Sequence, residues 1–416
     1  MKEIKRKSFY YIYMLLMFMW AGRVTPIFDN LGLLQNPVSF IIFFLLNCYV
    51  FRKVYSWSTL KRILPFFCIL FIWYICSIFK LGINQPLPWT NFYSLIISYN
   101  GVNLYKDKLF FYFEKVLIDL CLLSLIVWGG AILLPGIIPP ILKLISLPVS
   151  NSITESHIGL VGLFPDSDVF LFRRNLGFTW EPGRFSCFIL LGMLFNLMRT
   201  QCRLNSNNNL YILFLSLLST GSTTGFASFT VIILYILANK GYQSKFLTII
   251  LCVLILPFVL ALPFMQEKIV NVFSLSDEIE IIDYYAEQNT NSGTWVPQRG
   301  VGLYFDYLNF SNDPLLGYGN IQNSYIFNLY KGFDIQLSNG LIQIFATYGI
   351  IIGLYFYYLC YRSTICIAKQ LNISGWYFFF ILFCLINVSY NFWQTSLLMM
   401  FVFYDVLTKK AQSIIL

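Results

Sequence analysis

The stretch from Arg173 to Met198 reads RRNLGFTWEPGRFSCFILLGMLFNLM and joins a charged segment to an apolar one. Its first twelve residues contain three arginines and one glutamate, and the residues after Arg184 are uncharged as far as Met198. An apolar run of this length predicts a short membrane-spanning helix. Pro182 occupies a position where a first-turn helix proline is favoured. We therefore expect a membrane helix over 184–198 that begins, with its charges, at the membrane surface.

The composition extends this interpretation to the whole chain. Of its 416 residues, 58% are hydrophobic and only 11% are charged, whereas soluble domains carry about 25% charged residues. We therefore expect one polytopic, all-α integral membrane domain over residues 1–416, with no separate soluble domain. The basic N-terminus leads into an apolar run that lacks a small-residue cleavage site, which predicts a retained first span and not a signal peptide.

The apolar runs predict about 12 transmembrane helices and two long loops, at about 135–183 and 266–337. The stretch 89–105 is more polar than the others, and it either crosses the membrane or re-enters it. Crossing agrees better with the charge of the residues that follow. The expected spans are 9–26, 37–51, 63–79, 89–105, 109–134, 184–198, 210–220, the return from the turn at 221–225 to 239, 245–265, 338–361, 375–390 and 393–407.

The basic residues predict how the chain is oriented. If both termini are cytoplasmic and both long loops extracytoplasmic, 18 of the 28 lysines and arginines fall on the inner side, as the positive-inside rule requires. The second long loop carries nine acids against three basic residues. The net charge of +9 therefore follows from membrane topology and does not indicate nucleic-acid binding.

The end of the first long loop is the first candidate site. Arg173, Arg174 and Arg184 lie close to Glu181 in sequence, and arginine binds phosphate oxygens through two parallel hydrogen bonds. The helix that begins at Pro182 directs unpaired N–H groups at the same place, which favours an anion. Alternatively, the arginines reach lipid headgroups and pair with acids of the loop.

Two further clusters could contribute. Ser222, Thr223 and Thr224 lie between two apolar half-spans, and they predict either a broken helix pair that lines a cavity or a tight outer turn. Arg299, in the acidic second loop, could contact a phosphate or a sugar. It could equally form a salt bridge to Asp306 or Glu287.

Several single features favour structural roles. His157 lies in no motif, so packing within its loop is the favoured role. Asp119 falls inside the span 109–134, and Lys115 at i−4 is its expected partner. None of the ten cysteines falls in the two long loops, so we expect no disulfide framework, and no metal-ligand spacing is present.

The chain resembles the O-antigen polymerase and ligase superfamily of bacterial envelope glycosyltransferases. The resemblance covers most of the chain from about 184 to 361, together with the loop segment just before it. It is carried by the order of short motifs between about a dozen spans. These motifs are RNLGFTWEP at 174–182, STTG at 222–225, Arg299 ahead of PLLGYG at 314–319, and NGL at 339–341 with YGI at 348–350.

The resemblance implies a lipid-dependent architecture of the GT-C kind in the bacterial inner membrane. In that family, a glycan on undecaprenyl pyrophosphate is transferred from its anomeric carbon to an acceptor hydroxyl. The donor is already activated, so no cofactor or metal is expected. Arg173, Arg174, Arg184 and Arg299 would bind the pyrophosphate and stabilise its developing charge. Glu181 is the candidate general base.

The same resemblance names the partners and the alternatives. The expected partners are lipid-linked oligosaccharides as donor and acceptor, the bilayer, a chain-length regulator and a flippase. Ser222, Thr223, Thr224, Ser338 and Asn339 would line the pocket. The ligase branch places a histidine where this chain has Ser338, which favours the polymerase over a ligase that transfers the glycan to lipid A core. A glycolipid transporter is the alternative of another class, and it would carry more ionisable groups at the membrane midplane than this chain does.

Overall fold

A computed structural model of the chain forms two compact units, each assembled from separate chain segments. The first unit comprises Met1–Tyr55, Ile96–Lys240 and Ala368–Phe379, and the second comprises Ser56–Leu95, Gly241–Ile367 and Phe380–Leu416. The structure describes residues 2–22, 37–81, 89–145, 147–150, 155–159, 162–165, 174–179, 181–205, 207–239, 294–295, 299–319, 323–330, 334–335, 340–371, 375–389, 391 and 395–408.

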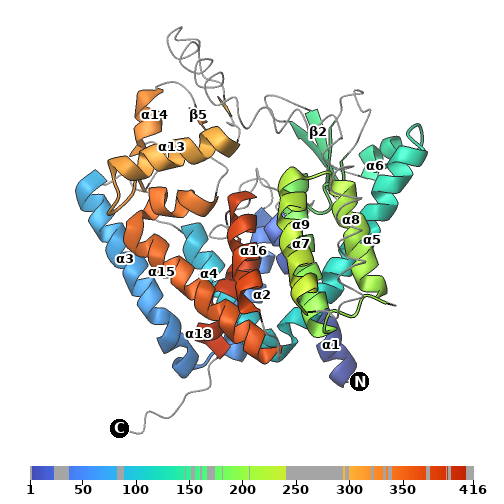
Figure 1. Ribbon diagram of the computed structural model, residues 1–416, viewed down its shortest axis with the longest axis horizontal. Coiled ribbons are helices and arrows are strands. Elements are labelled where there is room, and N and C mark those ends of the chain that lie inside the picture. The colour runs from blue at the N-terminus through green and yellow to red at the C-terminus, as the bar shows by residue number, and fades with distance from the viewer. Residues whose placement is uncertain are drawn as a thin grey trace. The chain divides into compact units, whose positions relative to one another are not determined.

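The first unit is built from long apolar helices, of which α7, α8 and α9 lie side by side (Figure 1). Helix α5 packs against α1, α7 and α8. Helix α4 enters this unit at Ile96. The helices are α1 (Lys2–Gly22), α2 (Pro37–Val54), α4 (Trp89–Tyr105), the 3-10 turn η1 (Lys106–Lys108), α5 (Leu109–Leu133), α6 (Ile138–Ile145), α7 (Pro182–Arg199), α8 (Asn208–Thr220) and α9 (Thr223–Asn239).

A buried carboxylate joins three of these helices. Glu114 of α5 is 3% exposed. It accepts two hydrogen bonds from Arg199 at the end of α7, at 2.8 and 2.9 Å. Asn196 of α7 and Asn209 of α8 also donate to Glu114, at 2.7 and 3.2 Å. Because a buried charge is stable only when it is paired and hydrogen-bonded, this network fixes α5, α7 and α8 relative to one another.

The first long loop contains regular structure that the sequence analysis did not predict. Helix α6 begins it, and three short strands then form an antiparallel sheet in the order β1-β2-β3. The strands are β1 (Leu147–Ser150), β2 (Glu155–Gly159) and β3 (Gly162–Pro165). In the register, His157 of β2 lies opposite Pro148 of β1 and Phe164 of β3. This lone histidine is therefore part of a sheet in the loop.

The second unit is also mainly helical. Its helices are α3 (Trp57–Leu81), α13 (Arg299–Asn312), α14 (Tyr325–Leu329), α15 (Gly340–Gln370, up to Ile367), α16 (Trp376–Ser389, from Phe380), α17 (Ser396–Val402) and α18 (Tyr404–Thr408). Two short strands, β4 (Thr294–Trp295) and β5 (Asp334–Ile335), pair in parallel. Aromatic contacts join α3 to α15, with the Phe66 and Tyr355 ring centroids 5.8 Å apart.

A kink in α15 receives the loop that follows α13. Gly349 adopts φ 78° and ψ 176° inside the helix, which is a conformation open essentially to glycine alone. The kink places the Ile350 N–H on the Pro314 carbonyl at 2.8 Å, and the Tyr318 N–H donates to the Ala346 carbonyl at 2.9 Å. Two stretches that carry the family resemblance, 314–319 and 348–350, therefore pack directly against each other.

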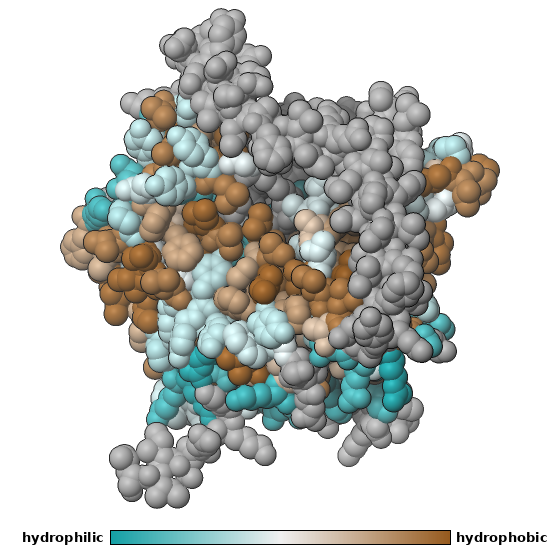
Figure 2. Space-filling view, viewed as in Figure 1, coloured by the Kyte–Doolittle hydropathy of each residue, from teal (hydrophilic) through white to brown (hydrophobic). Residues whose placement is uncertain are grey.

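Among the residues that the structure describes, three helical stretches are long and apolar enough to cross a membrane: Trp57–Lys80, Phe92–Leu133 and Gly340–Gln370. The surface of α3 fits this role, because Phe71, Ile72 and Phe79 expose 54%, 59% and 86% of their area. Figure 2 shows apolar side chains over the middle of α3 and hydrophilic ones toward its ends. The protein is thus a helical membrane protein.

The expected spans agree with most of the described helices. Span 89–105 coincides with α4, and span 109–134 ends one residue beyond α5. The expected span 393–407 differs, because α17 ends at Val402 and α18 begins at Tyr404. The expected span 245–265 lies outside the described residues.

Candidate functional site

The site is built in the first unit, where the end of the first long loop meets the end of α8. The Asn175 N–H donates to the Ser219 carbonyl at 2.9 Å, and the Arg174 Nε donates to the Thr220 carbonyl at 3.0 Å. The last carbonyls of a helix lack partners within it and carry partial negative charge, so a guanidinium suits them. The loop that carries the arginines is thereby attached to the turn that carries the hydroxyl cluster.

Asn175 is the centre of the attachment. It is buried, with 4% of its area exposed. Its side-chain nitrogen donates to Ser219 Oγ at 2.9 Å and to Ser124 Oγ of α5 at 3.2 Å. Its side-chain oxygen accepts from the Gly177 N–H at 2.9 Å, which closes an Asx turn. Asn175 therefore satisfies its own polar atoms while it connects the loop to α5 and α8.

Gly177 and Phe178 set the direction of the loop toward α7. Gly177 has φ +55°, and a Cβ atom there would lie 2.6 Å from the Phe185 ring. The Phe178 ring is fully buried. It packs against Phe18 of α1 at 5.3 Å and against Phe185 and Phe188 of α7 at 5.6 and 5.2 Å. This aromatic cluster holds the loop at the start of α7.

Glu181 is the N-cap residue of α7, and Pro182 follows it as the first helical residue. The Glu181 carbonyl accepts from the Arg184 N–H at 3.1 Å, while its carboxylate makes no capping bond to the helix. Thr179 Oγ1 donates to the carbonyls of Leu176 and Glu181, at 2.9 and 2.8 Å. The backbone around Glu181 is thus fixed independently of its side chain. Glu181 and Arg184 are both half-buried.

The hydroxyl cluster forms a tight turn between α8 and α9. Gly221 ends α8 in the left-handed conformation, with φ 53°. Ser222 Oγ accepts from the Gly225 N–H at 3.1 Å and lies 3.3 Å from Thr224 Oγ1. The Ser186 hydroxyl of α7 donates to Ser222 Oγ at 3.4 Å. Both predicted alternatives, the broken helix pair and the outer turn, contain a turn of this kind between two helices.

Gly225 allows α9 to approach α7 closely. A Cβ atom at this position would lie 2.8 Å from Cβ and Oγ of Ser186. Ser186 belongs to the first turns of α7, the helix that also carries Arg184. The turn at Ser219–Gly225 therefore contacts both the Arg174 loop, through the Thr220 carbonyl, and the first turns of α7, through Ser186.

The other predicted site residues are described less fully. Arg173, Ser338 and Asn339 lie outside the described residues. Arg299 is the first residue of α13 in the second unit and is described by its backbone alone. Arg299 had two expected salt-bridge partners. Glu287 is also outside the described residues. Neither carboxylate oxygen of Asp306 has a hydrogen-bond partner in the described part of the chain.

One predicted pairing is wrong. Asp119 accepts a hydrogen bond from the Tyr11 hydroxyl at 2.7 Å, and Lys115 lies over the Tyr11 ring, 5.8 Å from its centroid. The i−4 spacing brings Lys115 and Asp119 to one face of α5, but α1 packs there and supplies a neutral donor. Sequence spacing within one helix could not reveal this tyrosine of another helix.

Sequence reasoning also missed Asn175 and Ser219 as the residues that attach the loop. Their polar side chains in otherwise apolar surroundings were the available signal. Within the described residues, no group of three or more histidine, cysteine, aspartate or glutamate side chains could hold a metal ion. The chain matches no protein-family model, and none of the curated proteins compared with it shows significant similarity.

Proposed function

We propose that this protein is a membrane glycosyltransferase that polymerises surface polysaccharide of the O-antigen kind. The proposal rests on the motif resemblance and on one observation, the attachment of the Arg174 loop to the turn at Ser219–Gly225. Arg174 Nε donates to the Thr220 carbonyl at 3.0 Å, and this bond fixes the plane of the guanidinium. A fixed plane favours two-pronged binding of phosphate oxygens, as a pyrophosphate leaving group requires.

The proposed reaction needs an anion site, an acceptor hydroxyl and a base. The bond between the anomeric carbon and the pyrophosphate oxygen breaks, and the electron pair leaves with the undecaprenyl pyrophosphate. The acceptor hydroxyl oxygen bonds to the anomeric carbon, and its proton passes to the Glu181 carboxylate. Arg174 and Arg184, with Arg173 beside them in sequence, stabilise the negative charge that develops on the leaving group.

Arg184 supports this assignment through its position. It lies in the first turn of α7, where a positive charge is unfavourable because the helix N-terminus is itself positive. Glu181, the N-cap residue, offsets part of that conflict, and an anion bound at this end would offset more of it. In the structural alternative, Arg184 binds a lipid phosphate or pairs with an acid of the loop. The two ideas therefore differ in what Arg184 binds.

The first test of the proposed function is the effect of removing this protein on surface polysaccharide. In a strain that lacks this protein, a polymerase is expected to leave a single repeat unit on the lipid A core. A ligase would leave no repeat on the core while long chains remain lipid-linked. An unchanged polysaccharide profile would contradict both assignments.

The arginine role is tested by Arg184→Lys, which keeps the charge and removes the planar fork. We expect most of the polymer to be lost while the amount of protein in the membrane stays normal. Lys53→Arg, a change at an exposed basic residue of α2, is the control and should leave chain lengths unchanged. If the Arg184→Lys variant makes polysaccharide with wild-type chain lengths, the role of Arg184 is to bind lipid headgroups and not the pyrophosphate.

A further inference from the structure

A short apolar hairpin joins α5 to α6 in the first unit, and its tip comprises residues 132–141. Residues 132–137 are all exposed, and none of the residues from 120 to 142 carries a charge. The exposed apolar side chains of the tip are Ile132 (45%), Leu133 (80%), Leu134 (49%), Ile137 (55%) and Ile141 (48%). Figure 2 shows apolar side chains gathered where Figure 1 places α6 and the end of α5. A contiguous exposed apolar surface marks a place where a protein contacts a membrane or another protein.

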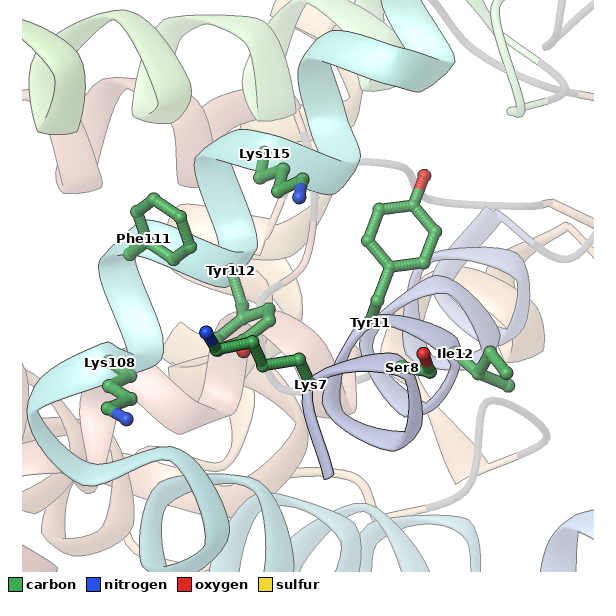
Figure 3. A pocket seen from close by; sticks show the side chains of 8 residues that line it. All are labelled: Lys7, Ser8, Tyr11, Ile12, Lys108, Phe111, Tyr112 and Lys115. Atoms are coloured by element: carbon green, nitrogen blue, oxygen red, sulfur yellow. The ribbon is translucent and has the colours of Figure 1, made fainter. Parts of the chain in front are cut away.

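The charged residues of α5 lie at its other end. They are Glu114, Lys115 and Asp119, all in the first half of the helix. Glu114 is buried in the network described above, and Asp119 is hydrogen-bonded to α1. Figure 3 shows Lys115 beside α1, with Lys108 of η1 lining the same cavity. Lysines near a helix end reach the lipid headgroups, so this end of α5 lies at one surface of the membrane.

The length of α5 places the hairpin tip within the membrane. At 1.5 Å per residue, α5 rises about 21 Å from Asp119 to Leu133 and about 38 Å from Lys108 to Leu133. The hydrocarbon core is about 30 Å thick, and the usual tilt of a membrane helix shortens both distances along the bilayer normal. Because the core begins between Lys108 and Asp119, Leu133 lies in hydrocarbon or at its far boundary.

Helix α6 folds back along α5 instead of leading away from it. A Cβ atom at Gly130 would lie 3.5 Å from Cγ1 of Ile138, so α6 begins beside the last turn of α5. By helical spacing, Ile138, Ile141 and Ile145 return to one face of α6, and Lys143 falls on the opposite face. A helix with one apolar face and one basic face lies in the membrane interface. Because α6 also contacts β2, it positions the sheet β1–β3 at the membrane surface.

We propose that the hairpin tip is inserted among lipid acyl chains at the far end of α5, and that it anchors the first long loop to the membrane surface. Lipid is the partner because the exposed surface of the tip continues that of α5, which belongs to a stretch long enough to cross a membrane. Ile126 and Leu133 lie seven residues apart on one face of α5, and they expose 71% and 80% of their area. This inference is independent of the proposed glycosyltransferase activity.

The test places an environment-sensitive fluorescent amino acid in place of Ile137 in the full-length protein, reconstituted in phosphatidylcholine nanodiscs. Quenching by brominated lipid measures contact with acyl chains, and quenching by iodide measures contact with water. The same probe in place of Ile126 is the lipid reference. In place of Asn205, which is exposed in the turn between α7 and α8, it is the water reference. We expect brominated lipid to quench the probe at 137 nearly as strongly as at 126, and iodide to quench it several-fold less than at 205.

Two outcomes of this experiment would overturn the proposal. Iodide quenching at 137 equal to that at 205 would place the tip in water. Protection of the probe from both quenchers would show that protein covers the tip, as in a dimer of this chain.

A second experiment tests whether the apolar side chains themselves hold the tip in lipid. With the probe in place of Ile141, Ile137→Asp should reduce quenching by brominated lipid several-fold and raise quenching by iodide. The reason is that aspartate is among the costliest side chains to place in a membrane. Ile137→Leu keeps the apolar area and is the matched control, so it should change neither. Unchanged quenching in Ile137→Asp, or an equal change in Ile137→Leu, would show that these side chains do not anchor the tip and would overturn the proposal.

Discussion

Asp306 of α13 is a carboxylic acid that is fully buried in the second unit. Neither of its oxygens has a hydrogen-bond partner in the described part of the chain. Burial raises the pKa of Asp306 well above its ordinary value, because the charged form loses its hydration. The same burial, with the charge of Asp306 nearby, raises the pKa of Tyr318. Asp306 is therefore held as a neutral acid over a range where an exposed aspartate is ionised.

The raised pKa of Asp306 predicts how stability depends on pH. The folded protein binds the proton more tightly than the unfolded chain does. The contribution of Asp306 is thus fully present below the ordinary pKa of about 3.9 and is lost as the pH rises toward the folded pKa. Asp306→Asn, which is neutral throughout, should reduce the loss of thermal stability between pH 5 and pH 8. The control is Asp107→Asn, at an exposed aspartate in η1, and it should retain the wild-type dependence. An unchanged slope in Asp306→Asn would contradict the prediction.

Glu181 offers a second test at the level of single residues. Its carboxylate does not cap α7, and Thr179 and Arg184 fix the surrounding backbone through the Glu181 carbonyl. Glu181→Gln keeps the shape and removes the basicity. If Glu181 is the general base, the variant should be as stable as the wild type and bind the lipid-linked donor, but lose on the order of 100-fold or more in polymer synthesis. Retention of substantial activity would assign Glu181 an orienting role. A tritiated or fluorescent donor separates binding from transfer.

At the scale of elements, the kink in α15 and the loop 313–319 depend on each other. Gly317 and Gly319 have positive φ values, and their N–H groups donate to the carbonyls of Asp313 and Thr347. Trp73 Nε1 of α3 donates to the Leu316 carbonyl at 2.8 Å, and Lys80 of α3 pairs with Asp313 at 2.6 Å. One loop thus connects α3, α13 and α15.

Gly349→Ala should disrupt this connection. A Cβ atom at Gly349 would collide with the Leu315 backbone, and its φ of 78° is unfavourable for alanine. We expect a loss of about 1–3 kcal/mol in the free energy of unfolding from the backbone conformation alone. Gly302→Ala in α13 is the control, because a Cβ atom there meets nothing within 4 Å. The control should stabilise the helix by up to about 1 kcal/mol. Equal unfolding midpoints for the two variants would refute this account.

At the scale of the whole molecule, the topology is the main prediction. Both termini are expected in the cytoplasm and both long loops outside, because most lysines and arginines then fall inside. Ser292 lies in the second long loop, outside the described residues. Ser292→Cys should react with a membrane-impermeant maleimide in intact cells from which the outer membrane barrier has been removed. The control is Lys106→Cys, at the turn η1, which should react only after the cells are opened. The reverse labelling pattern would invert the topology.

Most of the helices could be predicted from the sequence, because the length and composition of an apolar run are local properties. The bounds of α4 and α5 follow from their runs, and Pro182 and Gly221 mark the start of α7 and the end of α8. The small sheet β1–β3 was not predicted. Its strands have four or five residues each, and such short strands depend on pairing with neighbours more than on their own pattern.

The sequence by itself determined that this is a helical membrane protein with basic ends to its helices and a charged segment before α7. It also singled out Arg174, Glu181, Arg184 and Ser222 by residue type. Only the tertiary structure decided that Arg174 binds the Thr220 carbonyl and that Asn175 binds Ser219, positions more than forty residues apart. It also decided that Asp119 binds Tyr11 instead of Lys115. Local pattern sets which helices form, whereas contacts between helices depend on how their side chains pack, and no spacing within one helix encodes that packing.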